Sequence, residues 1–140
     1  MTDLVVRVEQ ARQRWNANDL PGYLSLYDEK ITLHGHSPEP MNKPAVKAFY
    51  EQIWACFGES GKAPSLHFFE TMQQGEFYSC RFALEGKHVG TFMGVAATGR
   101  SILLPGITMM RFSNGQVVER WSQADMLGLL VQIGALPPPS

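Results

Sequence analysis

Residues 115–134 read GQVVERWSQADMLGLLVQIG, and this segment carries the signature of the fold. We expect a strand over Gln116 to Ala124 and then a helix from about Asp125 to Ile133, which a glycine stops. Just upstream, Asn114 and Gly115 form the clearest turn signal in the chain, because both residues tolerate the positive φ angles of a two-residue type I′ hairpin. The strand therefore folds back on the segment before it.

The segments before this hairpin are short, rich in β-branched or aromatic residues and separated by glycines, which is typical of a meander of strands. We expect these strands over residues 65–73, 76–84, 87–95 and 101–112, with turns at Gln74-Gly75, Glu85-Gly86 and Thr98-Gly99. The second half of the chain therefore forms a sheet.

Helices dominate the first part of the chain. Apolar residues recur every three or four positions from Leu4 to Trp15, which predicts an amphipathic helix. Asp19 caps a second short helix, which we expect to run to about Asp28, and Asn42 begins a third; Ile31 to His36 alternates between them as a strand does. Helices that precede a run of strands favour an α+β fold, in which helices cover one face of a mostly antiparallel sheet. A strongly bent sheet of this kind would enclose a pocket.

Composition limits the function classes. With 140 residues and 44% hydrophobic content, the chain fits the size of one domain over residues 1–140 and can bury a core. A formal net charge of −1 creates no long-range field for phosphate backbones, so we expect no nucleic-acid partner. The apolar runs are short and no export signal is recognisable, so we expect no membrane partner. Cys56 and Cys80 match no metal-ligand spacing, which leaves a reduced, cytoplasmic setting as the default.

The Asn114-Gly115 turn also predicts a register, because a two-residue loop pairs Ser113 with Gln116 and sets every later pair across the hairpin. One face then collects the pairs Thr108–Trp121, Met110–Glu119, Gly106–Gln123 and Leu104–Asp125. The opposite face, which suits the outside or a partner's surface, carries Ile107, Met109, Arg111, Val118, Arg120 and Ser122. A small-molecule site needs a few polar groups among bulky apolar ones, so the first face is the expected pocket for a small hydrophobic molecule.

Asp125 is the first catalytic candidate on this face. A carboxylate that enters an apolar pocket loses hydration, its pKa tends to rise, and it can then exchange protons near neutrality. The same residue is also placed to be the N-cap of the last helix, where it would accept from the N–H of Leu127 or Gly128. Both roles stay open. Glu119 lies two pairs nearer the turn, where it either contacts substrate or sits at a solvated rim.

Histidines are the other titratable candidates. His34 and His36 are separated by one residue, so on a strand they project from the same face, where one of them could transfer a proton or orient a substrate. A metal site would need a further ligand, and no HExxH motif or carboxylate-rich cluster accompanies them, so we expect no metal and no cofactor. His88 either points inward as a second catalytic candidate or is a hydrogen-bonded structural residue, and His67 is equally open.

Trp15, Tyr23 and Tyr27 recur at helical spacing and are most simply core residues, although a hydroxyl among them can reach a ligand. We therefore keep Trp15 and Tyr27 as candidates for substrate contact. The rest of the expected substrate-binding set consists of Trp121, Gln123, Thr108, Met110, Glu119 and His34.

Several stretches of the chain resemble a known family. They are Gly86-Lys87-His88-Val89-Gly90-Thr91-Phe92-Met93-Gly94, Ala97-Thr98-Gly99-Arg100, residues 115–121 (GQVVERW) and residues 125–130 (DMLGLL). Their order and spacing are similar to the pattern of the SnoaL-like polyketide cyclase family, over nearly the whole chain. Lys87 and Ala96-Ala97 depart from that pattern, at positions where the family carries a threonine and a proline-containing pair, and these departures could alter the shape of the pocket.

The resemblance implies the NTF2-like fold, a cone of helices wrapped by a curved sheet, which usually forms a homodimer through the sheet. It also implies a cofactor-free intramolecular aldol closure of a polyketide ester, with a pocket aspartate as general acid/base, and Asp125 matches the aspartate that follows the family's strand. We therefore expect an enzyme in which Asp125 moves a proton next to a carbonyl. Gln123 and Thr108 would orient the oxygen, while Trp121 and Met110 would contact the substrate.

Two other functions fit the same scaffold. One is a non-catalytic protein that holds a hydrophobic metabolite in the cone. The other is an epoxide hydrolase or ketosteroid isomerase-like activity, which pocket carboxylates would also run. The hydrolase interpretation needs a further acid and an arginine facing Asp125, where the predicted register places Leu104.

Overall fold

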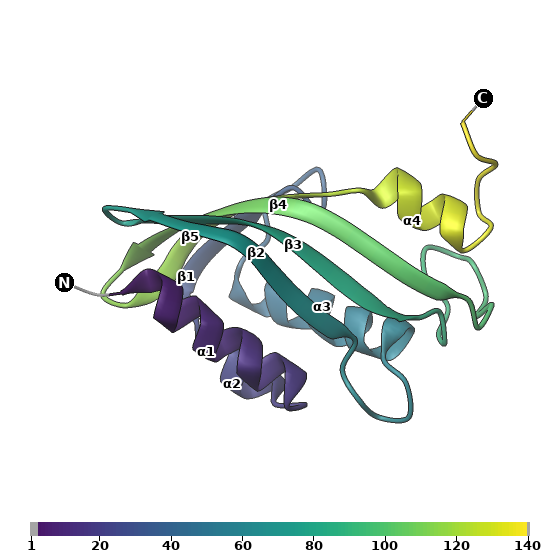
Figure 1. The fold of residues 1–140 in the computed structure, drawn as a ribbon, viewed down its shortest axis with the longest axis horizontal. Coiled ribbons are helices and arrows are strands. Elements are labelled where there is room, and N and C mark those ends of the chain that lie inside the picture. Colours follow the sequence, from purple (N-terminus) through teal and green to yellow (C-terminus); the bar gives the residue numbers. More distant parts are fainter. Residues whose placement is uncertain (1–2, 140) are drawn as a thin grey trace.

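A five-stranded sheet forms the body of the protein in the computed structural model, which describes residues 3–139. The strands are β1 (Tyr27–His34), β2 (Ser65–Gln74), β3 (Phe77–Lys87), β4 (Ser101–Ser113) and β5 (Gln116–Ala124), arranged in the order β1-β5-β4-β3-β2. Neighbouring strands are antiparallel except β1 and β5, which run parallel. The long strands curve over the N-terminal helices, as Figure 1 shows. The expected α+β fold with a mostly antiparallel sheet is confirmed.

Helices α1 (Leu4–Asn16), α2 (Leu20–Leu24) and α3 (Lys43–Phe57) lie on the concave side of the sheet, and α4 (Met126–Gln132) follows β5 beyond it (Figure 1). Each helix begins at a side chain that accepts a hydrogen bond from its first turn; these residues are Asp3, Asp19, Asn42 and Asp125. An acceptor in this position satisfies an N–H group that has no partner inside the helix. The helix starts predicted at Asp19 and Asn42 are therefore confirmed.

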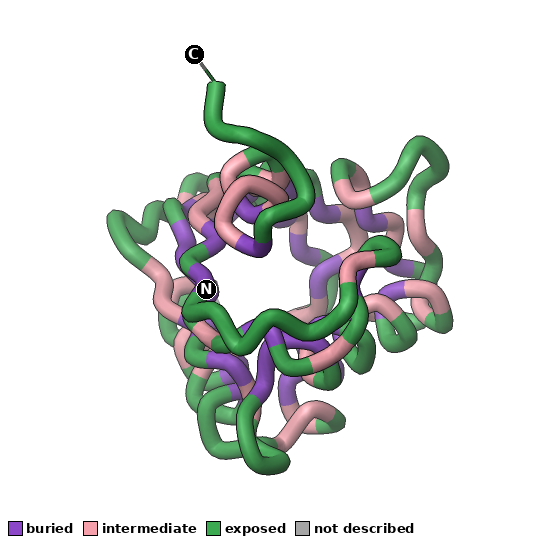
Figure 2. Tube along the Cα trace, turned by 90° about the vertical axis from the view of Figure 1, so that its right-hand side faces the viewer, coloured by how far each residue is buried: buried purple, intermediate pink, exposed green. Residues whose placement is uncertain are grey.

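The core lies between these helices and the concave face of the sheet. The apolar stripe of α1 is buried there, with Val8 and Trp15 at 0% and 1% exposure, and α3 contributes Val46 and Phe57, both at 0%. Figure 2 shows the same arrangement, with buried segments around the interior and exposed turns outside. Among residues 3–139, no helix is long and apolar enough to cross a membrane.

The second helix is shorter than the sequence predicts. It stops at Leu24, whereas the sequence pattern predicts a helix to Asp28, and β1 already begins at Tyr27. The N–H of Val117 on β5 donates to the carbonyl of Leu26 over 2.8 Å, and Leu26 and Tyr27 are fully buried. Pairing with β5 and burial therefore override the local helical spacing.

The predicted strand over residues 87–95 is wrong. Strand β3 continues through Gly86, where the sequence pattern predicts a turn, and residues 88–100 form a loop. The N–H groups of Val89 and Gly90 donate to the carbonyl of Cys56 at the end of α3, so they cannot join a strand ladder. A Cβ at position 86 would lie 2.2 Å from the carbonyl oxygen of Phe57, so glycine lets β3 pass close to α3.

The hairpin of β4 and β5 contains a β-bulge that shifts its register. Its turn is the predicted one, because Asn114 and Gly115 have φ angles of 51° and 78°. Phe112 pairs with Val117 as expected, but Arg111 then pairs with Glu119, so Val118 is the extra residue. Because side chains alternate along a strand, a shift of one residue turns every later β5 side chain to the opposite face.

The predicted pocket face is therefore correct on β4 and wrong on β5. Thr108, Met110 and Leu104 are buried as expected. On β5, however, Arg120 and Ser122 are buried at 4% and 1% exposure. The β5 residues that the unshifted register assigns to the pocket lie on the outer face instead; these are Glu119, Trp121 and Gln123.

Candidate functional site

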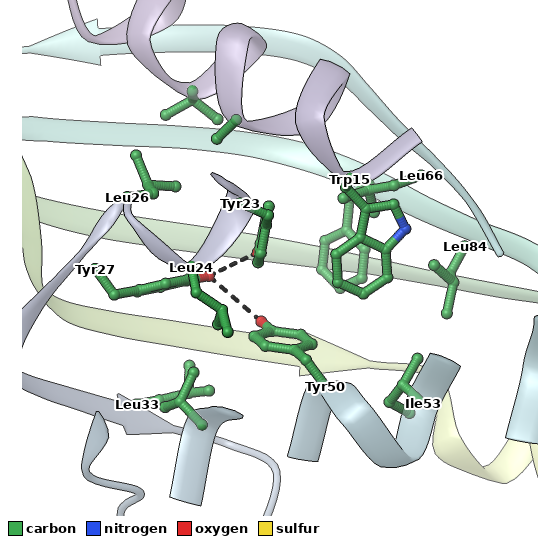
Figure 3. Close-up of a cluster of buried hydrophobic side chains, with 14 of the residues drawn as sticks. Trp15, Tyr23, Leu24, Leu26, Tyr27, Leu33, Tyr50, Ile53, Leu66 and Leu84 are labelled. Carbon is green, nitrogen blue, oxygen red and sulfur yellow. Dashed lines mark hydrogen bonds between the residues drawn. The ribbon is translucent and has the colours of Figure 1, made fainter. Parts of the chain in front are cut away.

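A pocket lies between the concave face of the sheet and helices α1, α2 and α3, and we call it the Arg120 pocket. Its apolar wall consists of Trp15, Phe49, Ile53, Leu66, Phe82, Leu84, Leu104 and Ala124, and its polar lining of Tyr23, His36, Tyr50, Arg120 and Ser122. Figure 3 shows the rings of Trp15, Tyr23 and Tyr50 close together between α1 above and α3 below, in front of the strands. The pocket volume is about 50 Å³. A water needs about 10–15 Å³, so the pocket holds a few waters or one small polar group, and a larger ligand must displace wall side chains.

Arg120 is the centre of the polar lining. Its Nε donates to Thr108 Oγ1 over 2.8 Å, and its Nη1 donates to the hydroxyls of Tyr23 and Tyr50 over 3.1 and 2.9 Å and to that of Tyr27. The hydroxyls of Tyr23 and Tyr27 are themselves 2.7 Å apart (Figure 3). These partners come from α2, β1, α3 and β4, so the guanidinium joins elements that are distant in sequence.

None of these partners is a carboxylate. Burial raises the pKa of the Tyr23 and Tyr27 hydroxyls above the usual range, so both are neutral at pH 7. The neighbouring Glu119 lies on the outer face, where it contacts His34 and Arg111 over 2.9 and 3.3 Å. Because guanidinium stays protonated in proteins, Arg120 is a buried cation with no Asp or Glu among its hydrogen-bond partners in the described chain. Such a group attracts negative charge strongly, since little water screens it.

His36 is the second titratable group of the pocket. Its ring stacks on Phe49 with 4.6 Å between centroids. Burial lowers the pKa of His36 to about 4, and the positive charge of Arg120 adds to the effect. The imidazole is therefore neutral at pH 7, and a neutral imidazole can accept a proton.

The prediction that His34 and His36 share one face is wrong. Strand β1 ends at His34, whose Nε2 lies 2.9 Å from Glu119 Oε2 and whose ring stacks on Trp121 on the outer face. Gly35 follows with a φ of +109°, and a Cβ there would lie 1.8 Å from the carbonyl oxygen of Ser122. Only glycine fits this conformation, which breaks the alternation and brings His36 to the pocket.

Ser122 completes the polar lining. It is 1% exposed, and its hydroxyl has no hydrogen-bond partner within the described chain. A buried hydroxyl without a partner costs free energy that a ligand oxygen would recover. Ser122 lies two residues after Arg120 on the same face of β5, so both side chains can meet one ligand.

Asp125 has the capping role and lies outside the pocket. Its Oδ1 accepts from the N–H of Gly128 over 2.8 Å, and the residue is exposed. The sequence leaves two roles open for Asp125, and in the structure Asp125 is the N-cap of α4. The register shift is the physical reason, because it removes the carboxylate from the face on which we expected it.

His88 anchors the loop over residues 88–100. Its ring Nδ1 accepts from the backbone N–H of Thr98 over 3.2 Å, and the backbone N–H of His88 donates to the carbonyl of Arg100 over 2.8 Å. The ring is fully buried, and its Nε2 has no partner among the described residues. These contacts match the structural alternative for His88. His67, the other open histidine, pairs with Glu85 over 3.0 Å at a half-exposed site.

The remaining candidates divide between the pocket and its support. Trp15 lines the pocket and donates from Nε1 to the carbonyl of Pro64 over 2.7 Å. Tyr27 and Thr108 hold Arg120, and Met110 is a core residue at 0% exposure. Within residues 3–139, no three His, Cys, Asp or Glu side chains are grouped as they would be around a metal ion.

Sequence reasoning missed Arg120, Ser122 and Tyr50. Arg120 follows Glu119 directly, and such a charged pair usually marks an exposed strand edge, so the burial of Arg120 has no local signal. The adjacent valines at 117 and 118 are the one available hint of a bulge, because strict alternation cannot bury both.

Comparison with known proteins gives a consistent family match. The family described as SnoaL-like polyketide cyclase matches residues 5–133. An aklanonic acid methyl ester cyclase, DnrD from Streptomyces peucetius, is 26% identical over 94% of this chain and 89% of its own. A second such cyclase, DauD from Streptomyces sp. (strain C5), is 28% identical over 94% of this chain and 80% of its own.

Solved structures give the same result for the fold. AclR from Streptomyces galilaeus, described as a candidate hydroxylase, superimposes with a TM-score of 0.84 at 25% identity, over 95% of this chain and 96% of its own. The α+β architecture is that of the NTF2-like fold.

Proposed function

The chain belongs to the SnoaL-like polyketide cyclase family, and we propose that it is an enzyme that moves a proton beside a carbonyl group of a small hydrophobic molecule in the Arg120 pocket, without a cofactor. The observation that carries the proposal is the buried Arg120, which has no carboxylate among its hydrogen-bond partners in the described residues and lines a pocket with a mostly apolar wall. A preorganised cation in such a site stabilises the negative charge that develops on oxygen when a carbonyl compound loses its α-proton. The apolar wall binds the rest of the molecule.

His36 is the base in this proposal. Its neutral imidazole takes the α-proton, and the resulting enolate oxygen lies against Arg120. In ring closure, the enolate carbon then attacks a second carbonyl of the same molecule and forms the new carbon–carbon bond. The His36 imidazolium returns its proton to the alkoxide, so the cycle consumes neither an oxidant nor a reductant. Ring closure is the preferred reaction because the two relatives described above are both named as cyclases.

The two alternative activities that use a pocket carboxylate are not favoured, because the described lining of the pocket contains no carboxylate. An epoxide hydrolase or a ketosteroid isomerase-like enzyme that relies on a pocket carboxylate would need an Asp or Glu there, and neither is among the described residues that line the pocket. Non-catalytic binding of a hydrophobic metabolite uses the same pocket and differs only in the absence of turnover.

A homodimer through the sheet is part of the proposal. The outer face of the sheet exposes several large apolar side chains; they are Phe69, Leu103, Ile107, Met109 and Trp121. Exposed apolar patches on a sheet favour association, and the isologous contact of two identical faces is the simplest way to cover them.

The experiment is a turnover assay with model substrates, which does not require the natural substrate. The protein is incubated with a panel of small diketones and keto esters that can close a ring. The products are separated by chromatography and identified by mass spectrometry. The proposal expects a cyclised isomer with the parent protein and at least a hundredfold less with Arg120→Met, because a lost oxyanion donor costs about that factor. Equal rates with both proteins, or binding with no turnover of any compound, would contradict it.

A further inference from the structure

The charge balance around Arg120 determines which form of a ligand the pocket prefers. The titratable groups near the guanidinium are Tyr23 from α2, Tyr27 from β1, Tyr50 from α3, Tyr78 and Cys80 from β3, and His36. Burial raises the pKa of Tyr78 and of the Cys80 thiol, so these groups, like Tyr23 and Tyr27, are uncharged at pH 7. The burial that disfavours charge on Tyr23, Tyr27, Tyr78 and Cys80 also keeps these groups from serving as counter-ions to Arg120.

Two donor atoms, Arg120 Nη2 and Ser122 Oγ, remain free in the pocket among the described residues. The hydrogen bonds of Arg120 within the described chain use Nε and Nη1, which leaves the two N–H groups of Nη2. The hydroxyl of Ser122 is buried and has no partner among the described residues. Both residues line the pocket from the same face of β5. A ligand oxygen there would meet one cationic donor and one neutral donor.

We infer that the Arg120 pocket binds its ligand as an oxyanion, held jointly by Arg120 Nη2 and the Ser122 hydroxyl. The inference rests on the proposed function and deepens it by naming the charged form in which the ligand binds and the two donor atoms that hold it. A bound enolate neutralises Arg120, and its single charged oxygen matches the two free donors. A carboxylate is the weaker fit, because two-point binding needs two guanidinium nitrogens and only Nη2 is free.

The lining of the pocket suits a flat ligand beside the charged oxygen. Trp15, Phe49 and Phe82 present aromatic surface around the polar lining, against which a flat ring can stack or pack edge-on. The volume of about 50 Å³ encloses the charged oxygen and its nearest atoms. A complete ring needs movement of a wall residue, and Ile53 is the aliphatic wall residue contributed by α3.

The test uses 4-nitrophenol, whose anion absorbs at longer wavelength than its neutral form, and 4-nitroanisole, which has the same ring and cannot ionise. Absorbance is titrated against pH with and without excess protein. We expect bound nitrophenol to stay anionic at a pH about one unit below its transition in free solution, and to bind at least tenfold more tightly than nitroanisole. Ser122→Ala should weaken nitrophenolate binding about tenfold and leave nitroanisole binding unchanged, since it removes one hydrogen bond to a charged oxygen.

Three further measurements separate the effect of the charge of Arg120 from the effect of ligand shape and size. Arg120→Lys keeps a cation and should retain part of the shift in the nitrophenol transition, whereas Arg120→Met should abolish it. Benzoate carries the same ring with a carboxylate and should bind more weakly than nitrophenolate. Ile53→Ala widens the pocket and should tighten nitrophenolate binding if the ring is too large for the parent.

Three outcomes would overturn the inference. They are equal binding of nitrophenol and nitroanisole with no shift in the transition, tighter binding of benzoate than of nitrophenolate, and no binding of nitrophenol to either the parent or Ile53→Ala. The turnover assay fails independently: cyclisation of neutral ketones without phenolate binding would retain the proposed function and remove this inference. Phenolate binding without turnover of any compound would do the reverse.

Discussion

Arg120 on β5 donates from Nε to Thr108 Oγ1 on β4 over 2.8 Å, and both side chains lie on the concave face of the sheet. Without the bulge at Val118, the register would turn Arg120 to the outer face, where Ile107 and Met109 are exposed. The extra residue Val118 in β5 is therefore the reason that Arg120 points into the pocket. Bulges are common beside functional sites for this reason, because they redirect a side chain.

Arg120→Met should cost no stability. Arg120 is a buried charge without a counter-ion among its hydrogen-bond partners, so its removal recovers a desolvation cost that offsets the hydrogen bonds lost to the tyrosines and to Thr108. Urea unfolding of the parent and the variant measures the difference. A loss of more than ~2 kcal/mol would show instead that the hydrogen bonds to the three tyrosines outweigh the cost of burying the charge.

His36 predicts a pH dependence of stability. Its pKa is about 4 in the folded protein, against about 6.5 in an unfolded chain, so the unfolded state binds more protons between these values. The contribution of neutral His36 to the free energy of unfolding should therefore be complete above about pH 6.5. The free energy of unfolding should fall by roughly 2–3 kcal/mol as the pH drops to 4. His36→Gln cannot titrate, so its urea midpoints at pH 7 and pH 4.5 should lie closer together than those of the parent. An identical difference in the two proteins would count against a buried, neutral His36.

Asp125→Ala should lower stability without affecting the pocket. The side chain caps α4 through the N–H of Gly128, and loss of an N-cap costs about 1 kcal/mol. Asp125→Asn keeps an acceptor and should unfold at nearly the parent's urea concentration. Equal loss in both variants would mean that the carboxylate charge contributes more than the cap.

Gly35→Ala should damage both stability and the site. The φ of +109° disfavours any side chain, and the new Cβ would lie 1.8 Å from the carbonyl oxygen of Ser122. Gly61→Ala is the matched control, because its φ is also positive, +76°, and no atom lies within 4 Å of its Cβ. We expect a loss of about 1–2 kcal/mol for the control and a clearly larger loss for Gly35→Ala in the same thermal unfolding assay. Similar losses would mean that the contact with Ser122 relaxes easily.

Ile107→Glu tests the homodimer. Ile107 is 65% exposed on the outer face of the sheet, so a charge there should leave the fold intact and prevent two faces from meeting. Sedimentation should give a dimer mass for the parent and a monomer mass for the variant. A monomeric parent would remove the homodimer from the proposal.

Local patterns predicted the elements that depend on local chemistry. The caps at Asp19 and Asn42 and the Asn114-Gly115 turn each rely on residues within a few positions, and all three are confirmed. The α2 end and the 88–100 loop were missed because their backbone groups bind distant partners, β5 and the end of α3.

The residues of the pocket could not be predicted from local patterns either, because their positions also depend on residues that are distant in sequence. Arg120 is buried because tyrosines from three elements converge on it, and no window of sequence contains that information. His36 enters the pocket through the positive φ of Gly35, which alternation in a strand cannot foresee. The burial of Trp15 and Thr108 could be predicted, because their own elements follow regular periodicity; Trp15 lines the pocket and Thr108 binds Arg120.

The most direct test of the proposed chemistry is hydrogen exchange at the α-carbon of a small diketone in deuterated water, followed by NMR. This measures proton removal itself and requires no ring closure. We expect catalysed exchange by the parent and by Asp125→Asn, and loss of catalysis in His36→Gln, with all three proteins folded by circular dichroism. Catalysis that survives in His36→Gln and disappears in Asp125→Asn would contradict the role of His36 and return the role of base to Asp125.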